Sequence, residues 1–440
     1  MSGRFFGGVH PFYNKELAGS SPIEVMPMPE ELVVHFSQNL GAPPKPVVEK
    51  GESVKRGQVI ADAAGFVSAR VHAPTSGTVK SIGDYPNPVG TDMPAALIIP
   101  DGNDEWADTC DNETSTGDLS AKDIRERVMQ GGLVGMGGAT FPTHVKLSPP
   151  KDKKIDLLIV NGAECEPYLT SDHRLMVERS GGIIEGAVIF TKAIGAGSVV
   201  VAIEKNKPDA VERMQRAVEG RDGLRVEVLD VIYPQGAEKQ LIFAITGRRV
   251  PAGGLPMDVG VLVQNVGTCY AAYEALALGR PLTERVVTVS GAGIVKPKNV
   301  LARIGTKFSD LVSYCGGMTD DAGKVISGGP MMGVAQYSLE ASVTKGTSGI
   351  VVLRSGEVAQ YTGDACIRCG RCVDACPMRL LPSALSIYIE RMNFEMASEY
   401  NVMDCIECGC CAYVCPSKRP MVHHFRRGKA EVRKISEKAG

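Results

Sequence analysis

The sequence has 440 residues, and its 48 Lys and Arg residues nearly balance its 50 Asp and Glu residues, which leaves a formal charge of −2. This balance excludes a protein that binds nucleic acid through bulk positive charge. Hydrophobic residues make up 44% and charged residues 22% of the chain, as in globular proteins, so general disorder is excluded as well. At roughly 150 residues per domain, the length predicts about three domains.

The most apolar stretch, residues 183–203, carries Glu185 and Lys192. A membrane span needs about 20 mostly uncharged apolar residues, so this stretch is better explained as a buried helix followed by a strand. The N-terminus has neither the apolar core nor the cleavage site of an export signal. We therefore expect a cytoplasmic protein, which could still lie against a membrane protein.

Residues 1–100 are rich in Pro, Gly and Val, and short apolar runs alternate with turns. This pattern predicts a small all-β sandwich, and its two halves resemble those of biotinyl and lipoyl domains. The lysine that such carriers modify is not evident, so we expect a structural or docking domain without biotin or lipoate. Residues 101–120 are polar and acidic and predict a linker.

From residue 121 to residue 284, strand-like and helix-like segments alternate, which predicts a doubly wound α/β domain. The predicted strands are residues 155–160, 198–203, 225–231 and 260–263, and the predicted helices are residues 182–194, 208–218, 238–245 and 269–278. The pattern changes at residues 285–340, where a strand at 286–290 and a helix near 307–315 predict a small mixed domain.

Nine of the 13 cysteines lie between Cys366 and Cys415. An odd count without an export signal argues against a disulfide framework. The cysteines instead form two copies of C-x2-C-x2-C-x3-C-P, the spacing with which bacterial ferredoxins hold two [4Fe–4S] clusters. The predicted ligands are Cys366, Cys369, Cys372, Cys376, Cys405, Cys408, Cys411 and Cys415. Zinc, the main alternative, uses four ligands and does not require two copies of a 3+1 pattern.

In this motif the first three cysteines bind one cluster, and the fourth binds the neighbouring cluster. We therefore predict that Cys376 completes the cluster of the second triplet and that Cys415 completes the cluster of the first. Cys410 should face elsewhere and be dispensable. The remaining cysteines are expected to be plain small residues: Cys110, Cys165, Cys269 and Cys315.

The cysteine motifs lie in a C-terminal segment, residues 355–440, in which residues 382–399 predict a helix between the two copies. The tail from Pro416 has eight Lys and Arg residues and two Glu residues. This composition is typical of a solvated basic helix or of a docking surface for an acidic partner or membrane.

Two segments of the α/β domain are candidates for ligand binding. Residues 131–143 (GGLVGMGGATFPT) are glycine-rich, and glycines let backbone N–H groups approach a phosphate or a flat ring. The loop is not the dinucleotide fingerprint G-x-G-x-x-G. Residues 161–167 (NGAECEP) follow a predicted strand, where ligands of open α/β sheets gather. Taken alone, each segment could also be a turn without a ligand.

Residues 132–147 and 161–167 resemble segments of the FMN- and NADH-binding subunit of respiratory complex I, as do residues 233–238 (YPQGAE) and 264–268 (QNVGT). Segments FGGVHP and HAPTSG in the first 100 residues, with the tandem cysteine motifs, extend the match. Nearly the whole chain is similar to the RnfC family of subunits of the Rnf complex. That membrane complex passes electrons between reduced ferredoxin and NAD and couples this transfer to ion translocation.

The resemblance implies that residues 285–340 form a β-grasp module of the soluble-ligand-binding type and that the α/β domain binds FMN and NAD(H). Residues implied to line the FMN phosphate and ribityl chain are Gly135, Gly137, Gly138 and Lys146. Residues implied to hold the flavin are Asn161, Tyr233, Gly236 and Asn265. Glu164, Glu166 and Glu238 would face the flavin ring or the nicotinamide, with Phe141 as an aromatic neighbour. No side chain is expected to act as a nucleophile or general base.

The expected function is therefore exchange of hydride with NAD(H) at FMN and of single electrons through two [4Fe–4S] clusters. The resemblance implies other Rnf subunits as partners, both integral membrane and ferredoxin-like, and ferredoxin as a further candidate. It also implies a peripheral position on the inner face of the cell membrane. Two alternatives stay open: a corrinoid reductase subunit of the propanediol-utilisation type, and a ferredoxin-like docking scaffold that has lost its flavin.

Overall fold

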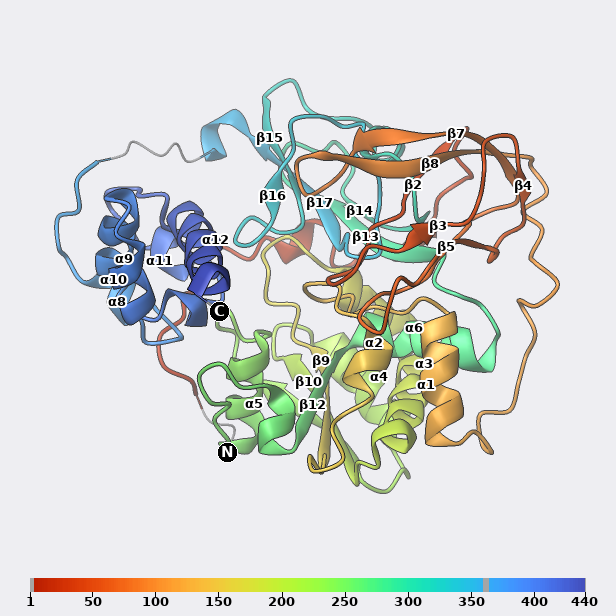
Figure 1. The fold of residues 1–440 in the computed structure, drawn as a ribbon, viewed down its shortest axis with the longest axis horizontal. Helices are drawn as coiled ribbons and strands as arrows, with labels where there is room; N and C mark the ends of the chain where they lie inside the picture. The colour runs from red at the N-terminus through yellow and green to blue at the C-terminus, as the bar shows by residue number, and fades with distance from the viewer. Residues whose placement is uncertain (1–3, 359–363, 440) are drawn as a thin grey trace.

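The computed structural model describes residues 4–358 and 364–439. These residues form four β-sheets and a helical C-terminal unit that lies to one side of the sheets (Figure 1). This arrangement agrees with the predicted multidomain α/β class.

The N-terminal domain consists of two small antiparallel sheets, as the sequence predicts. One sheet has the strand order β2 (Leu32–His35), β8 (Asp92–Pro100), β7 (Gly77–Pro86) and β4 (Ser53–Val54), and the other has β3 (Lys45–Pro46), β5 (Val59–Asp62) and β6 (Val71–His72). The start of the predicted linker packs on this domain, because the Arg56 guanidinium lies 3.9 Å from the centre of the Trp106 ring. Lys55 also pairs with Glu105 at 2.9 Å.

The α/β domain is built on a four-stranded parallel sheet. Its strand order is β11 (Leu224–Leu229), β10 (Ser198–Glu204), β9 (Leu157–Gly162) and β12 (Val261–Asn265). Leu158 and Val160 of β9 point into the core formed with the helices on one face, and Leu157 and Ile159 point into the core on the other. Burial on both faces explains why this strand is a continuous apolar run in the sequence.

Seven helices of the described residues precede the C-terminal unit. They are α1 (Ala121–Gln130), α2 (Thr143–Lys146), α3 (Ser171–Ile194), α4 (Pro208–Val218), α5 (Glu238–Thr246), α6 (Val266–Ala277) and α7 (Phe308–Tyr314). Helix α3 begins eleven residues before the predicted start at residue 182, and it is kinked at Arg179, where φ is −132°. The sequence pattern misses the first part because Gly181 and Gly182 interrupt the helix signal.

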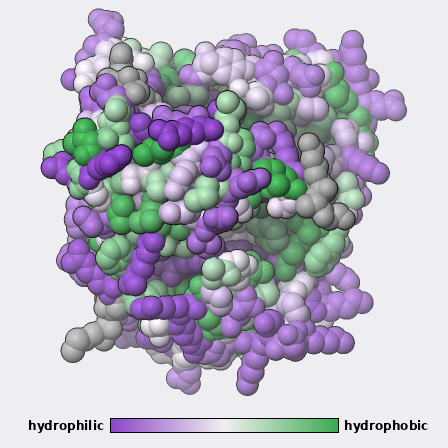
Figure 2. Space-filling view, turned by 60° about the vertical axis from the view of Figure 1, so that its left-hand side comes forward, coloured by the Kyte–Doolittle hydropathy of each residue, from purple (hydrophilic) through white to green (hydrophobic). Residues whose placement is uncertain are grey.

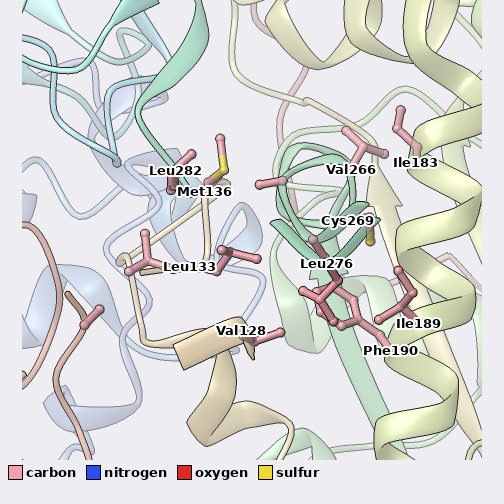
Figure 3. Packing of buried hydrophobic residues seen from close by; sticks show 14 of the residues in the cluster. Val128, Leu133, Met136, Ile183, Ile189, Phe190, Val266, Cys269, Leu276 and Leu282 are labelled. Carbon is pink, nitrogen blue, oxygen red and sulfur yellow. The ribbon is translucent and has the colours of Figure 1, made fainter. Parts of the chain in front are cut away.

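The core under the glycine-rich loop is formed by α1, α3 and α6. Figure 3 shows Val128, Leu133 and Met136 on one side of this core, with Phe190 and Val266 among the residues on the other. Cys269 is fully buried in the same cluster, as expected for a small core residue. Because Leu133 and Met136 are anchored here, the loop that follows them has a fixed starting point.

A six-stranded mixed sheet lies above the α/β domain in Figure 1. Its order is β1 (Ile23–Val25), β14 (Lys298–Arg303), β13 (Glu284–Ser290), β17 (Gly349–Arg354), β15 (Ala322–Ser327) and β16 (Val334–Ala335). Two strands come from outside the predicted range 285–340: β1, which pairs in parallel with β14, and β17. Sequence periodicity cannot find such additions because they depend on contacts between distant segments.

The C-terminal unit is helical. Its helices are α8 (Arg371–Asp374), α9 (Pro382–Glu390), α10 (Phe394–Glu399), α11 (Cys410–Tyr413) and α12 (Met421–Ala439). The predicted single helix over residues 382–399 is wrong, because Met392 has a φ of 55° and breaks it. Asn393 then caps α10 by accepting the N–H of Met396 at 3.1 Å. Short 3₁₀ turns complete the elements: Lys15–Leu17, Pro256–Val259, Ser355–Glu357 and Val402–Asp404.

Figure 2 turns the side of the molecule that carries the C-terminal unit toward the viewer. Hydrophilic side chains cover most of this face, and apolar residues form smaller patches between them. Within the described residues, every helix is too short or too polar to cross a lipid bilayer.

Candidate cofactor sites

The predicted flavin residues gather at the carboxyl edge of the parallel sheet. Asn161 lies near the end of β9 and Asn265 ends β12, and the two are register partners on adjacent strands. The chain order of the sheet reverses between these strands, since β10 and β11 continue on the far side of β9. Ligands of open α/β sheets bind at such a switch point.

The glycine-rich loop lies over the end of β12. A Cβ atom on Gly137 would lie 2.6 Å from the Asn265 amide nitrogen, whereas a Cβ on Gly138 would meet nothing within 4 Å. The N–H of Gly135 donates to the carbonyl of Phe141 at 2.9 Å and closes the loop. The loop can therefore press against Asn265 on one side and present bare backbone on the other.

Two further pairs of predicted residues meet at this edge. The Lys146 ammonium lies 3.0 Å from the Glu238 carboxylate and 3.1 Å from the carbonyl of Val263 in β12. The Asn161 side chain donates to the Gly236 carbonyl at 2.9 Å. The structure thus brings together predicted residues that are 75 and 92 positions apart in the sequence.

Glu164 has a structural contact that the sequence does not reveal. Its carboxylate accepts the backbone N–H groups of Asp172 at 2.7 Å and His173 at 3.2 Å, and so caps the start of α3. Asp172 in turn accepts the Asn265 side-chain amide at 2.7 Å. Burial and the neighbouring Glu164 raise the pKa of Asp172 to about 7. The sequence gives no signal for Asp172, because the predicted helix begins only at residue 182 and the contact with Asn265 joins segments far apart in the chain.

Glu166 and Tyr233 lie between the sheet edge and the C-terminal unit. The Glu166 carboxylate accepts the N–H of Met331 at 3.2 Å, and burial raises its pKa to about 7. The Tyr233 hydroxyl lies 3.4 Å from this carboxylate and donates to the carbonyl of Cys408 at 2.8 Å. These two residues therefore connect the predicted flavin site with the second cysteine motif.

Buried polar atoms without partners indicate that a polar ligand fits the sheet edge. The side-chain amide nitrogens of Gln235 and Gln264 are buried and find no acceptor among the described residues. Both residues adjoin predicted flavin residues, Gly236 and Asn265. Buried donors are normally satisfied, so these amides, the open backbone at Gly138 and the nearby Lys146 form a donor set that fits FMN.

The second cysteine triplet and Cys376 line one cavity. Cys405, Cys408, Cys411 and Cys376 surround it together with apolar walls that include Phe425. Among the described residues, no three His, Cys, Asp or Glu side chains are placed to hold a single metal ion. The thiols instead stand around a shared space, and four thiols are the donor set of a [4Fe–4S] cluster.

The first triplet is more open. Cys369 is exposed, Cys366 is half-buried and Cys372 is buried. Cys372 packs in the same apolar cluster as Cys415, its predicted partner. Cys410 is fully buried, with its sulfur 3.9 Å from the Tyr233 carbonyl. It also lines the same cavity as the second triplet, so it does not face elsewhere as the sequence predicts.

Four basic residues of the C-terminal tail form ion pairs within the unit. These pairs are Arg419 with Glu390, Arg426 and Lys429 with Glu407, and Lys434 with Glu431. These four charges are therefore neutralised within the unit, so fewer charges of the tail are left for the predicted docking surface.

Comparison with protein families divides the chain into four matches. Residues 3–103 match the RnfC barrel sandwich hybrid domain, and residues 128–274 match the Nuo51 FMN-binding domain. Residues 286–335 match the SLBB domain, and residues 359–416 match the 4Fe-4S dicluster domain. The chain therefore has an FMN domain and a domain for two [4Fe–4S] clusters, as the sequence predicts.

Relatives match over almost the whole chain. The C subunit of a proton-translocating ferredoxin:NAD(+) oxidoreductase complex of Clostridium ljungdahlii is 50% identical, over 99% of this chain and 95% of the relative. The C subunit of the Na(+)-translocating complex of Acetobacterium woodii is 44% identical, over 98% of this chain and 97% of the relative. The C subunit of an ion-translocating oxidoreductase complex of Rhodobacter capsulatus is 42% identical, over 97% of this chain and 82% of the relative. The corrinoid reductase alternative is not supported by these relatives.

A solved structure shares the fold. An NAD+-reducing [NiFe]-hydrogenase in the H2-reduced state matches this chain with a TM-score of 0.50 and 19% sequence identity. The match covers 72% of this chain and 64% of the hydrogenase chain. At this identity the likeness concerns the fold alone. The family is shown by the full-length relatives: the chain belongs to the RnfC family, the C subunits of ion-translocating ferredoxin:NAD(+) oxidoreductase (Rnf) complexes.

Proposed function

We propose that this chain exchanges hydride with NAD(H) at the carboxyl edge of the parallel sheet and passes single electrons through two [4Fe–4S] clusters in its C-terminal unit. Bound FMN supplies the chemistry that joins a two-electron donor to one-electron carriers. The protein's part is to hold the cofactors, orient them and exclude water between them.

The observation that carries the proposal is the position of Tyr233. Its backbone precedes Gly236 at the sheet edge, and its fully buried side chain donates to the carbonyl of Cys408 at 2.8 Å. One residue thus belongs to both the predicted flavin site and the loop of a predicted cluster. Such direct packing favours electron transfer between the two sites over two unrelated binding functions.

The same packing suggests the order of the clusters. The cluster held by Cys405, Cys408, Cys411 and Cys376 would lie next to the flavin site, because Cys408 contacts Tyr233. The cluster held by the first triplet and Cys415 would lie farther out, where Cys369 is exposed. We refer to these as the proximal and the distal cluster.

We assign the NAD(H) side of the site to Glu166 and Glu238 and the FMN phosphate to Lys146 with the glycine-rich loop. Glu166 sits beside Tyr233, and Glu238 pairs with Lys146. Because Glu164 caps α3, its contribution would be to fix the strand end rather than to contact a ligand.

As for partners, the similar proteins are named as subunits of ferredoxin:NAD(+) oxidoreductase complexes. We propose that this chain likewise assembles with the membrane and ferredoxin-like subunits of an Rnf complex, as a peripheral subunit on the cytoplasmic face. The exposed side of the distal cluster would be the exit toward those subunits.

The proposal is tested by reconstituting the full chain anaerobically with FMN, iron and sulfide and then adding NADH. We expect the flavin absorbance to bleach and reduced-cluster EPR signals to appear. Bleaching of flavin without cluster signals, or no flavin binding at all, would contradict the proposal, and the second result would favour the docking scaffold. Flavin should be released by denaturation, since we predict non-covalent binding.

The Glu238→Gln variant tests the assignment of the NAD(H) side. We expect it to slow NADH oxidation more than it lowers flavin content, because the substitution removes the carboxylate while the shape is kept. Equal loss of flavin and activity would mean that Glu238 acts only through its ion pair with Lys146 at 3.0 Å.

A further inference from the structure

The N-terminal segment contains a short strap, residues 5–9, that crosses from the α/β domain to the C-terminal unit. In Figure 1 the start of the chain runs between these two parts before it enters the β-sheets. The covalent connection to the C-terminal unit passes through residues 359–363, which lie outside the described residues. The strap adds non-covalent contacts between the two parts, beside the direct hydrogen bond from Tyr233 to Cys408.

On the flavin side the strap forms a two-bond bridge with Tyr233. The N–H of Val9 donates to the Tyr233 carbonyl at 2.8 Å, and the N–H of Tyr233 donates to the Val9 carbonyl at 2.9 Å. Val9 is buried in a small apolar cluster that also contains Ala375, Cys408 and Cys410. The strap is therefore paired with the residue that links the two sites.

On the cluster side the strap contacts the backbone next to Cys376. The N–H of Gly8 donates to the Ala375 carbonyl at 3.0 Å. A Cβ on Gly7 would lie 2.9 Å from the Ala375 oxygen and from the Cys376 carbonyl carbon, and Gly7 has a φ of +73°. Close approach and a left-handed backbone both require glycine here. Phe6 adds a cation–π contact with Arg379 at 4.9 Å.

We propose that the strap holds the proximal cluster at electron-transfer distance from the flavin site and so sets the rate at which electrons leave the flavin; this inference rests on the proposed function. One NADH supplies a hydride, which is two electrons with one proton. The two clusters accept one electron each, and the proton returns to solvent as the flavin is reoxidised. Residues 5–9 touch neither reactant, so they are positioning residues.

The experiment compares the full-length holoprotein with a chain that lacks residues 2–9 and with the Gly8→Ala variant. In this variant the new Cβ would lie 2.8 Å from the Tyr233 carbonyl at a φ of +83°. Phe12→Ala is the matched control, because Phe12 lies in the same segment but is 87% exposed. NADH is mixed rapidly and anaerobically with each protein, and flavin bleaching and cluster reduction are followed separately.

We expect the truncated chain and Gly8→Ala to keep their flavin, their iron and the rate of flavin bleaching. Cluster reduction should slow markedly, because the rate of electron transfer falls steeply as the distance between the two redox sites grows. Phe12→Ala should match the wild type. An unchanged rate of cluster reduction in both variants would overturn the proposal. Loss of iron would also overturn it, since the strap would then be part of the cluster fold.

A different result would contradict the proposed function itself. If NADH does not reduce the clusters even in the wild-type holoprotein, the route itself is wrong. If the wild type reduces them and the strap variants do so equally fast, only the role of the strap is wrong.

Discussion

The two cysteine motifs have the same spacing, and the structure gives them nearly the same backbone. Arg368 and Glu407 occupy equivalent positions, with φ values of 58° and 56°. Each donates its N–H, at 3.4 Å, to the sulfur of the first cysteine in its motif. Gly370 and Gly409, with φ values of 78° and 80°, then lead into α8 and α11. The motif therefore determines the local loop.

The surroundings of the two loops differ. Cys369 is exposed, while its counterpart Cys408 is buried. Arg371 is exposed, while its counterpart Cys410 is fully buried against Tyr233. The motif therefore determines the local backbone of each loop, whereas packing between domains determines which loop lies next to the predicted flavin site. Because solvent exposure and hydrogen bonds tune cluster potentials, two identical motifs can serve different steps.

Arg371 and Cys410 occupy equivalent positions in the two loops, and exchanging them should change electron transfer most strongly. Cys410→Arg would place an unpaired charge in a fully buried site, which costs several kcal/mol, and should separate the second loop from Tyr233. We expect flavin and iron to be retained while NADH-driven cluster reduction slows, because the rate of electron transfer falls steeply with the distance between the two sites. Rapid anaerobic mixing with NADH measures this rate.

The mirror substitution Arg371→Cys is the matched control. It removes an exposed charge from the first loop, so we expect little change in the same rate. Normal cluster reduction in Cys410→Arg would show that the second loop does not face the flavin site.

The next test concerns the cysteines that cross between the loops. Cys376→Ser should perturb the cluster of the second triplet, because Cys376 lines the same cavity as Cys405, Cys408 and Cys411. Cys415→Ser should perturb the other cluster, and Cys410→Ser should leave both intact. Iron content and EPR after anaerobic reconstitution measure the outcome. A Cys376 variant that loses the cluster of its own triplet would contradict the assignment.

Glu166 provides a pH-dependent test of the contact between the domains. Burial raises its pKa from 4.5 to about 7, so the folded protein holds the proton more tightly than the unfolded chain. This stabilising contribution is fully present below pH 4.5 and is lost as the pH rises through 7. The Glu166→Gln side chain does not ionise, so this variant should not lose stability as the pH rises. Relative to the wild type, its free energy of unfolding at pH 8 should therefore be higher by at most ~3 kcal/mol.

Denaturant unfolding at pH 5 and pH 8, followed by cluster absorbance, measures this difference. Glu238→Gln is the control, since the Glu238 side chain is 38% exposed and pairs with Lys146 at 3.0 Å. Equal pH dependence in wild type and Glu166→Gln would show that the carboxyl is hydrated rather than enclosed at the interface.

Substitutions in the basic tail should change the stability of the protein only slightly. Arg426→Ala removes one of two cations that pair with Glu407 in the second loop, and partly exposed ion pairs contribute ~1 kcal/mol or less. Arg433→Ala on the exposed face of α12 should leave stability unchanged. Thermal unfolding of the two variants makes the comparison. Equal effects would mean that the Glu407 pairs do not help to hold the second loop.

The spacing of the cysteines is sufficient to predict the two loops, because each loop is a short local segment, whereas the sharing of ligands between the loops stays a prediction. The alternating strand-like and helix-like segments likewise suffice to predict the α/β domain. The position of NGAECEP after an apolar run suffices to predict that these residues follow a strand. By contrast, the strap at residues 5–9, strand β1 and the capping role of Glu164 depend on contacts with residues far away or on side-chain direction. Local sequence patterns carry no information on such long-range contacts. The break at Met392 could not be predicted because the residues on both sides of it favour a helix.

If Tyr233 joins the two sites, the proximal cluster lies next to the flavin and is reduced first. Freeze-quench EPR during a single turnover with NADH tests it directly, with Cys369→Ser identifying the spectrum of the proximal cluster when the distal one is disrupted. We predict that the proximal signal appears first and that it still forms at the wild-type rate in Cys369→Ser. Earlier appearance of the distal signal, or its normal formation in Cys408→Ser, would contradict the account.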